Sequence, residues 1–245
     1  MLHGLLTLPI ILPVVFWSIY HYHKDRHLPE PPVNLLLCFG FGVLAAGLSK
    51  ALYIGLGPVG LRFDASLLAD TSTLGLLAYS LLAIGPIEEL AKLVPFLIFV
   101  RRFRAFDEPL DGIIYASFIA LGYATVENLY YLDFLTPLEA AARGFAGPIV
   151  HILFASIWGF SIGCAHIAGR SVWFAAARGF AIAAGLHGLY DFAVLQISMN
   201  ALPIAALIIL AIWIWRLKLM RTLHEEAKRA TEARAALRSR EREFI

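Results

Sequence analysis

The chain is poor in charged residues and in cysteine. Asp, Glu, Lys and Arg make up 16% of its 245 residues, whereas soluble domains carry about 25%. The two cysteines, Cys38 and Cys164, lie in apolar runs without CxxC or other metal-type spacing. We interpret them as small buried residues rather than as a disulfide framework or a zinc site. The composition therefore excludes an ordinary soluble domain and a cysteine-based scaffold.

Several familiar enzyme and transporter motifs are also absent. The chain has no nucleotide-binding glycine loop, no GxSxG elbow and no HExxH pair. No internal repeat indicates a transporter built from two halves. No cleavable signal peptide is evident, because the first basic residue, Lys24, follows the first apolar run. That order predicts an uncleaved start-transfer helix, and nothing in the sequence indicates a nucleic-acid partner.

Long apolar runs dominate the sequence instead. Hydrophobic residues make up 60% of the chain, and about 20 mostly apolar residues suffice to cross a bilayer. We therefore predict an all-α fold, a polytopic transmembrane helical bundle of about seven spans within residues 1–219. The predicted spans cover roughly residues 2–20, 33–56, 73–100, 109–132, 142–168, 172–197 and 201–219. A charged tail, residues 220–245, follows them.

The basic residues predict the orientation. Sixteen Lys and Arg fall on one side of the predicted membrane and two, Arg62 and Arg143, on the other. Cytoplasmic loops carry the excess of such residues, so we expect the N-terminus outside and the C-terminus in the cytoplasm. The expected location is the cell (inner) membrane, with the chain embedded in the lipid bilayer. The tail alternates Glu and Arg among alanines, which favours a solvated cytoplasmic helix over one lying on the lipid surface.

Ionisable side chains interrupt four of the predicted spans. A charge in hydrocarbon costs at least about 2.5–3.5 kcal/mol, so such residues normally face a polar site inside the protein. They are Glu88, Glu89, Lys92, Glu127, His151, His187 and Asp191. We infer a polar site between helices, within a catalytic core of about residues 73–197.

Small residues recur every four positions beside these groups. The stripes are Gly147–His151–Ala155–Gly159–Gly163, Gly179–Ala183–His187–Asp191, and Gly112–Ala116–Ala120–Ala124 leading to Glu127 and Asn128. Residues four apart share a helix face, and small residues let membrane helices approach closely. The polar groups are therefore predicted to lie at the closest helix contacts. Gly85 and Pro86, one turn before Glu88, predict a kink that would give water access.

These residue types suit the activation of a water molecule. One glutamate of the pair can take a proton from water, while Lys92, at i+3 and i+4, holds the other. The imidazoles can polarise a carbonyl or stabilise an oxyanion. His151 and His187 with a carboxylate can also bind a metal such as zinc. Spacing does not separate these mechanisms, and we slightly favour glutamate alone. Asp191 either belongs to the site or only orients His187.

Four motifs, each in its own span, resemble the PrsW-type intramembrane proteases of the CAAX protease and bacteriocin-processing superfamily. They are EELAK at 88–92, DGIIYASFIALGYATVENL at 111–129, RGFAGPIVH at 143–151 and HGLYDF at 187–192. Lys92 comes one residue earlier than the arginine of the wider superfamily's EExxxR, as in the PrsW branch. Ala116 and Tyr123 stand where Gly and Phe are expected, and neither change removes a catalytic group.

The resemblance implies an intramembrane endopeptidase acting on a membrane-anchored protein. Glu88, Glu89, His151, His187 and Asp191 would be catalytic, with Lys92, Glu127 and Asn128 in support. The family's namesake cuts a membrane-bound anti-sigma factor, so the implied substrate is an anti-sigma-factor-like or other single-pass protein. Two alternatives use the same buried groups: a proton- or ion-coupled carrier, and a noncatalytic membrane scaffold or sensor.

Overall fold

The computed structural model describes residues 2–24, 29–196 and 202–243, and within these ranges every regular element is helical. The long helices are α1 (Leu2–Lys24), α2 (Pro32–Gly55), α5 (Gly85–Ile98), α6 (Pro109–Tyr131), α7 (Pro137–Ile167), α8 (Val172–Leu195) and α9 (Leu202–Glu243). The short ones are α3 (Ala65–Thr71), α4 (Thr73–Tyr79), the π-helical turn η1 (Ser80–Ile84), and the 3₁₀ turns η2 (Val100–Arg102) and η3 (Leu132–Phe134). The predicted all-α class is confirmed.

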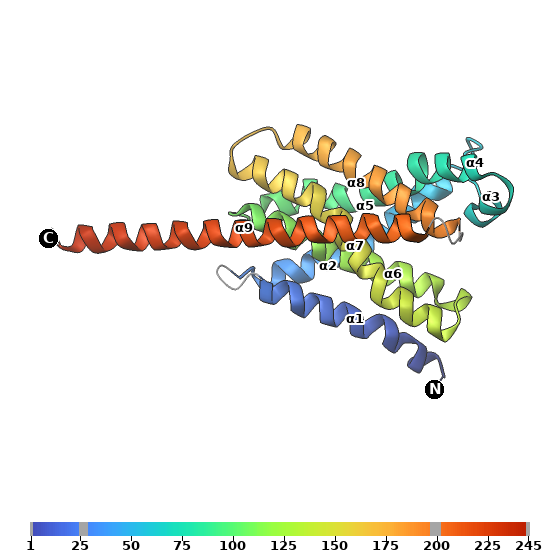
Figure 1. Cartoon of the computed structure of the whole chain (residues 1–245), viewed down its shortest axis with the longest axis horizontal. Helices are drawn as coiled ribbons and strands as arrows, with labels where there is room; N and C mark the ends of the chain where they lie inside the picture. Colours follow the sequence, from blue (N-terminus) through green and yellow to red (C-terminus); the bar gives the residue numbers. More distant parts are fainter. Residues whose placement is uncertain (1, 25–28, 197–201, 244–245) are drawn as a thin grey trace.

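Helices α6 and α7 form the centre of the bundle. They pack against each other, with α2 and α1 on one side and α8 and α9 on another (Figure 1). Five helices in the described part of the chain are long and apolar enough to cross a membrane: α2, α6 extended to Phe134, α7, α8, and α9 from Pro203 to Glu226. These correspond to five of the predicted spans. The first and third predicted spans correspond to α1 and to the run α4–η1–α5, and their crossing of the bilayer stays a prediction.

The third predicted span departs from α-helical geometry where the sequence predicted a kink. The turn η1 ends at Ile84, directly before Gly85 and Pro86, and the Gly85 N–H donates to the carbonyl of Ser80 five residues earlier. Proline cannot donate an N–H to the preceding turn, and a local π turn is a common adjustment next to it. Such turns are frequent at functional sites, and this one immediately precedes the two glutamates.

The connection before α4 contains the short helix α3. Asp64 accepts hydrogen bonds from the backbone N–H groups of Ser66 and Leu67 and so caps α3. A carboxylate at this position satisfies donors that the first helical turn leaves free. Helix α3 thus lies in the short stretch before the predicted span that begins at residue 73.

The small-residue stripes do lie at close helix contacts, although the shortest distances, 2.0 Å at Gly42 and Gly122, are between α2 and α6 outside the stripes. A Cβ atom at Gly112 would lie 2.2 Å from the carbonyl oxygen of Gly159, between α6 and α7. A Cβ at Gly179 would lie 2.7 Å from Cα of Trp158, between α8 and α7. Only glycine permits backbones to approach this closely. The prediction that each stripe faces a neighbouring helix is confirmed at these positions.

Helix α9 lies along the bundle and continues well beyond it at its C-terminal end (Figure 1). Arg216 and Met220 are its last residues buried against the bundle in the described part. Arg216 donates from Nε to Ser156 Oγ over 2.8 Å and from Nη2 to Ser117 Oγ over 3.1 Å. Beyond them Arg229 and Glu225 form an exposed pair of the predicted i,i+4 type. The anchored part of α9 thus ends near residue 220.

Truncation from residue 224 onward is expected to leave catalysis intact, because no predicted site residue lies in the tail and the contacts of Arg216 and Met220 remain. Membrane insertion and turnover of the truncated and full-length proteins would be compared. Loss of turnover in a truncated protein that inserts normally would show that the tail contributes directly.

The orientation is testable with reporters. A reporter active only outside the cytoplasm should work when fused after Arg62 or near Leu138, and fail after Arg104 or at Ile245. The physical reason is that Arg104 and Ile245 lie on the predicted cytoplasmic side, which carries the excess of Lys and Arg. The reverse pattern would overturn the proposed placement of the N-terminus outside.

Candidate active site

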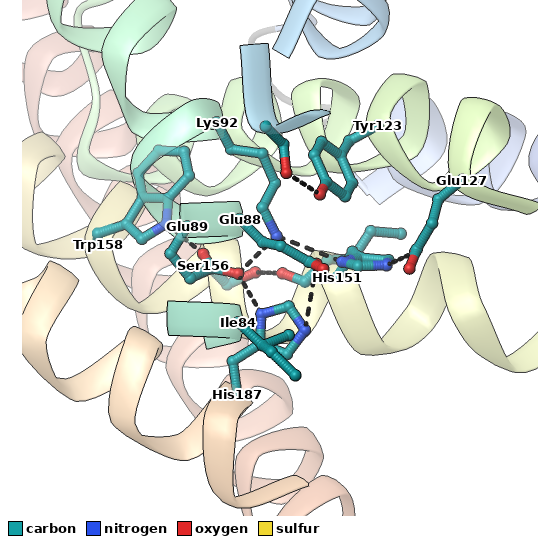
Figure 2. A network of polar contacts seen from close by, with 12 residues as sticks. Ile84, Glu88, Glu89, Lys92, Tyr123, Glu127, His151, Ser156, Trp158 and His187 are labelled. Atoms are coloured by element: carbon teal, nitrogen blue, oxygen red, sulfur yellow. Dashed lines mark hydrogen bonds and ion pairs between the residues drawn. The ribbon is translucent and has the colours of Figure 1, made fainter. Parts of the chain in front are cut away.

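Helix α5 places Glu88, Glu89 and Lys92 in the interior of the bundle. Lys92 and Glu89 have 0% exposed side chains, and Nζ of Lys92 donates to Oε1 of Glu89 over 2.5 Å. The other oxygen of Glu89, Oε2, accepts a hydrogen bond of 2.8 Å from Nε1 of Trp158. Removing one partner of a buried ion pair costs about 3–5 kcal/mol. Glu89 is thus a fixed carboxylate that helps to hold the site together (Figure 2).

Close packing of α8 on η1 and α5 brings His187 to Glu89. A Cβ atom at Gly85 would lie 2.3 Å from the carbonyl oxygen of Ala184, and one at Gly188 would lie 2.4 Å from that of Ser80. This approach lets Nδ1 of His187 donate to Oε1 of Glu89 over 2.8 Å. Because Nδ1 carries that proton, Nε2 is the ring nitrogen left to act on other groups.

Helices α6 and α7 hold the second histidine in the same way. Nε2 of His151 donates to Oε2 of Glu127 over 2.6 Å, and Nη2 of Arg143 pairs with Oε1 of Glu127 at 2.8 Å. Nδ1 of His151 lies 3.3 Å from Nζ of Lys92. The rings of His151 and His187 meet edge to face, with centroids 5.3 Å apart. Each imidazole is therefore oriented by its own glutamate.

Glu88 differs from Glu89 in having a free carboxylate oxygen. Its Oε2 is buried without a hydrogen-bond partner and lies 3.7 Å from Nε2 of His187. Oδ2 of Asp191 lies 3.6 Å from the same nitrogen and also lacks a hydrogen bond. The hydroxyl of Tyr53, from α2, donates to Oε1 of Glu88 over 3.4 Å. Buried polar atoms are normally paired, so two free oxygens around one imidazole nitrogen indicate a place for a water, ion or substrate.

The same residues fit a metal ion. Glu88, His151 and His187 each offer one ligand atom, and these atoms lie within 4.8 Å of one another. Metal-binding histidines commonly donate their second ring N–H to a carboxylate, as His151 and His187 do here. Nitrogen and oxygen ligands of this kind suit zinc.

The structure brings together most of the predicted site residues. One connected group across α5, α6, α7 and α8 is formed by Glu88, Glu89, Lys92, Glu127, His151 and His187 (Figure 2). Asp191 joins it through Oδ2, which lies 3.6 Å from Nε2 of His187. Asn128 is the exception among the described contacts. Its amide is buried beside Gly147, and neither amide atom has a hydrogen-bond partner. The roles of all these residues stay predictions.

Four contributors were not predicted: Tyr53, Tyr123, Arg143 and Trp158. Trp158 lies seven residues after His151 on α7, and Arg143 eight residues before it, so a search along that helix face could have found both. Tyr123 is similar, since it precedes Glu127 by four residues and its ring lies 4.9 Å from Nζ of Lys92. Tyr53 had no such signal, because its helix carries no predicted site residue.

A helical membrane bundle with glutamates and histidines gathered at a buried centre has the form of a membrane-embedded hydrolase. The model of the PrsW family intramembrane metalloproteases matches residues 30–216. Because this match covers well over half of the chain, the protein belongs to that family, and it is a membrane protease.

Curated relatives agree with this assignment. The chain is 32% identical to Protease PrsW of Geobacillus kaustophilus over 185 residues, which cover 76% of this chain and 77% of the relative. It is 30% identical to Protease PrsW of Clostridioides difficile over 226 residues, covering 87% and 88%. For Protease PrsW of Bacillus subtilis the identity is 30% over 191 residues, covering 77% and 82%. No solved structure gives a significant match.

Proposed function

We propose that this protease is an endopeptidase that hydrolyses a peptide bond of a membrane-anchored protein at the centre formed by Glu88, His151 and His187. The observation that carries the proposal is the free, buried Oε2 of Glu88, 3.7 Å from Nε2 of His187. The proposed substrate is a single-pass protein of the anti-sigma-factor type or another single-pass protein, and the proposed location is the inner cell membrane.

The site permits two mechanisms, and in the one without a metal ion Glu88 acts on water. Its free oxygen receives a proton from the water that attacks the scissile carbonyl, and later returns a proton to the leaving amine. Glu89 accepts hydrogen bonds from Lys92, Trp158 and His187, so its role is to position the imidazole. Tyr53, within hydrogen-bond distance of Glu88, helps to fix the orientation of that carboxylate.

The two histidines act on the carbonyl group of the scissile bond in this proposal. Glu127 and Glu89 fix the proton on one nitrogen of each ring. The other nitrogens point to the interior: Nδ1 of His151, which lies 3.3 Å from Nζ of Lys92, and Nε2 of His187. A metal held by Glu88, His151 and His187 would acidify a bound water and polarise the carbonyl. Asp191, with its free Oδ2 beside His187, is then the unligated carboxylate of the site.

The family's description and the Glu88–His151–His187 geometry favour the metal-dependent alternative over the glutamate-only mechanism that sequence reasoning placed slightly ahead. A carrier or a noncatalytic sensor would use the same buried groups without breaking a bond. The assignment to a protease family argues against both.

The proposed function is tested by incubating purified protein with single-pass membrane substrates in detergent and identifying the products by mass spectrometry. Cleavage by the wild-type protein and none by Glu88→Gln is the expected result. Liposomes containing the same two proteins provide the second measurement. Glu88-dependent ion flux without cleavage of any substrate would replace the protease proposal with the carrier.

A further inference from the structure

A large groove lies between α7, α8 and α9, and none of the predicted site residues lines it. Its volume is about 1140 Å³. Its lining is mainly apolar, with side chains such as Phe160, Phe174, Leu186 and Leu207. In a membrane protein, an apolar groove open to the surroundings is in contact with lipid chains unless another protein covers it.

The groove has the length of a lipid rather than of a small molecule. Along α8 its lining residues extend from Ser171, at the start of the helix, to Leu186. Fifteen residues of α-helix span about 22 Å. One leaflet supplies about half of a hydrocarbon core of about 30 Å. The groove therefore reaches from the level of the head groups to beyond the end of one leaflet.

The charged residues of the groove lie in the half nearer the start of α8. Arg170 lies just before α8, and Arg178 lies seven residues after Ser171, about 10 Å along the helix; both line the groove and are exposed. Among the described residues, no ion pair joins either arginine to an acidic side chain. Basic pockets between membrane helices at head-group level are typical binding sites for anionic lipids. The apolar length and the basic half thus match the two parts of one ligand.

We propose that the groove binds an anionic phospholipid, with its phosphate on Arg170 and Arg178 and an acyl chain along Leu186 and Leu207. A second transmembrane helix fits these observations less well. Acidic residues are rare in membrane spans because they are costly there, so such a helix would leave both arginines unpaired. A phospholipid phosphate at head-group level pairs with Arg170 directly. It pairs with Arg178 through that residue's long side chain, which reaches toward the N-terminal end of α8. The bound lipid bridges α8, which carries His187, and α9.

The test compares two lipids on lipid-stripped, full-length protein in a neutral detergent. Dioleoylphosphatidylglycerol and dioleoylphosphatidylcholine are titrated separately, and bound lipid is counted by native mass spectrometry. If each arginine contributes a factor of about five, the two together predict a preference of about 25-fold for the anionic lipid. Arg170→Gln with Arg178→Gln should reduce this preference to near one. The control pair, Arg102→Gln with Arg104→Gln, removes the same charge from exposed positions outside the groove and should leave it unchanged.

A substitution within the groove separates lipid binding from attraction to the general basic surface. Ala211→Trp fills the groove between α9 and its neighbours and should abolish retention of both lipids. If the arginine variant fails to fold, raising the ionic strength on wild-type protein should lower the preference, because exposed charges are screened. Equal retention of the two lipids by wild-type protein would overturn the proposal. The proposal would also be overturned if both pairs of arginine substitutions reduced the lipid preference equally. Retention of lipid by the Ala211→Trp variant would overturn it as well.

Discussion

Glu88→Gln is expected to lower turnover at least about 100-fold, the low end for loss of a general base, while the protein stays folded. The physical reason lies in the two oxygens of this side chain. Oε2 has no hydrogen-bond partner, so replacing it breaks no hydrogen bond in the described structure. An amide retains the shape and the contact with Tyr53 but cannot take a proton from water. Turnover and thermal unfolding would be measured on the same preparation.

Glu89→Gln provides the matched comparison one residue away. Glu89→Gln should lower turnover to a similar extent, and unlike Glu88→Gln it should also lower the stability of the protein. The amide cannot accept from Lys92, Trp158 and His187 at once, and Lys92 is left as a buried, unpaired charge. Loss of such a partner costs about 3–5 kcal/mol, which appears as a lowered unfolding temperature.

Asp70→Asn, on the exposed face of α3, is the control for general effects of removing a carboxylate. It should change neither the turnover nor the unfolding temperature. Glu88→Gln and Glu89→Gln variants that insert stably and both cleave at the normal rate would refute the assignment of the site.

The contrast between the two glutamates shows where sequence reasoning ends. The gathering of the ionisable residues was predictable, because charges in apolar helices need polar surroundings and the small-residue stripes gave each helix a contact face. Which glutamate pairs with Lys92 was not predictable, because i+3 and i+4 neighbours are both within reach. In the structure Glu89 also accepts hydrogen bonds from Trp158 of α7 and His187 of α8, contacts between distant parts of the chain that no local pattern shows.

Distant helices account for most of what the sequence did not show. Tyr53 reaches Glu88 from α2, and Ser117 and Ser156 hold Arg216 of α9, through contacts between residues far apart in the chain. No local pattern marks such residues, since tyrosines and serines are ordinary in membrane helices. The five helices long enough to cross the membrane were predictable, because hydrophobic length is a local property of the sequence.

Removal of metal is expected to abolish activity, and added Zn²⁺ to restore it, because Glu88, His151 and His187 present a set of ligand atoms that suits zinc. Metal content measured on the purified protein gives a readout that does not depend on turnover. His187→Ala and His151→Ala should each lower turnover about as much as Glu88→Gln, and should also lower the bound metal. Double variants should be little worse than single ones, since the residues act as one unit.

Asp191→Asn separates the two mechanisms that this site permits. If Glu88 alone activates water, the amide still orients His187, so the loss of turnover should be mild and chelation should have no effect. If Glu88 is occupied as a metal ligand, the free Oδ2 of Asp191 is the remaining carboxylate beside Nε2 of His187, and its loss should be severe. Full activity in metal-free protein, combined with a mild effect of Asp191→Asn, would leave the glutamate mechanism in place and exclude a catalytic metal.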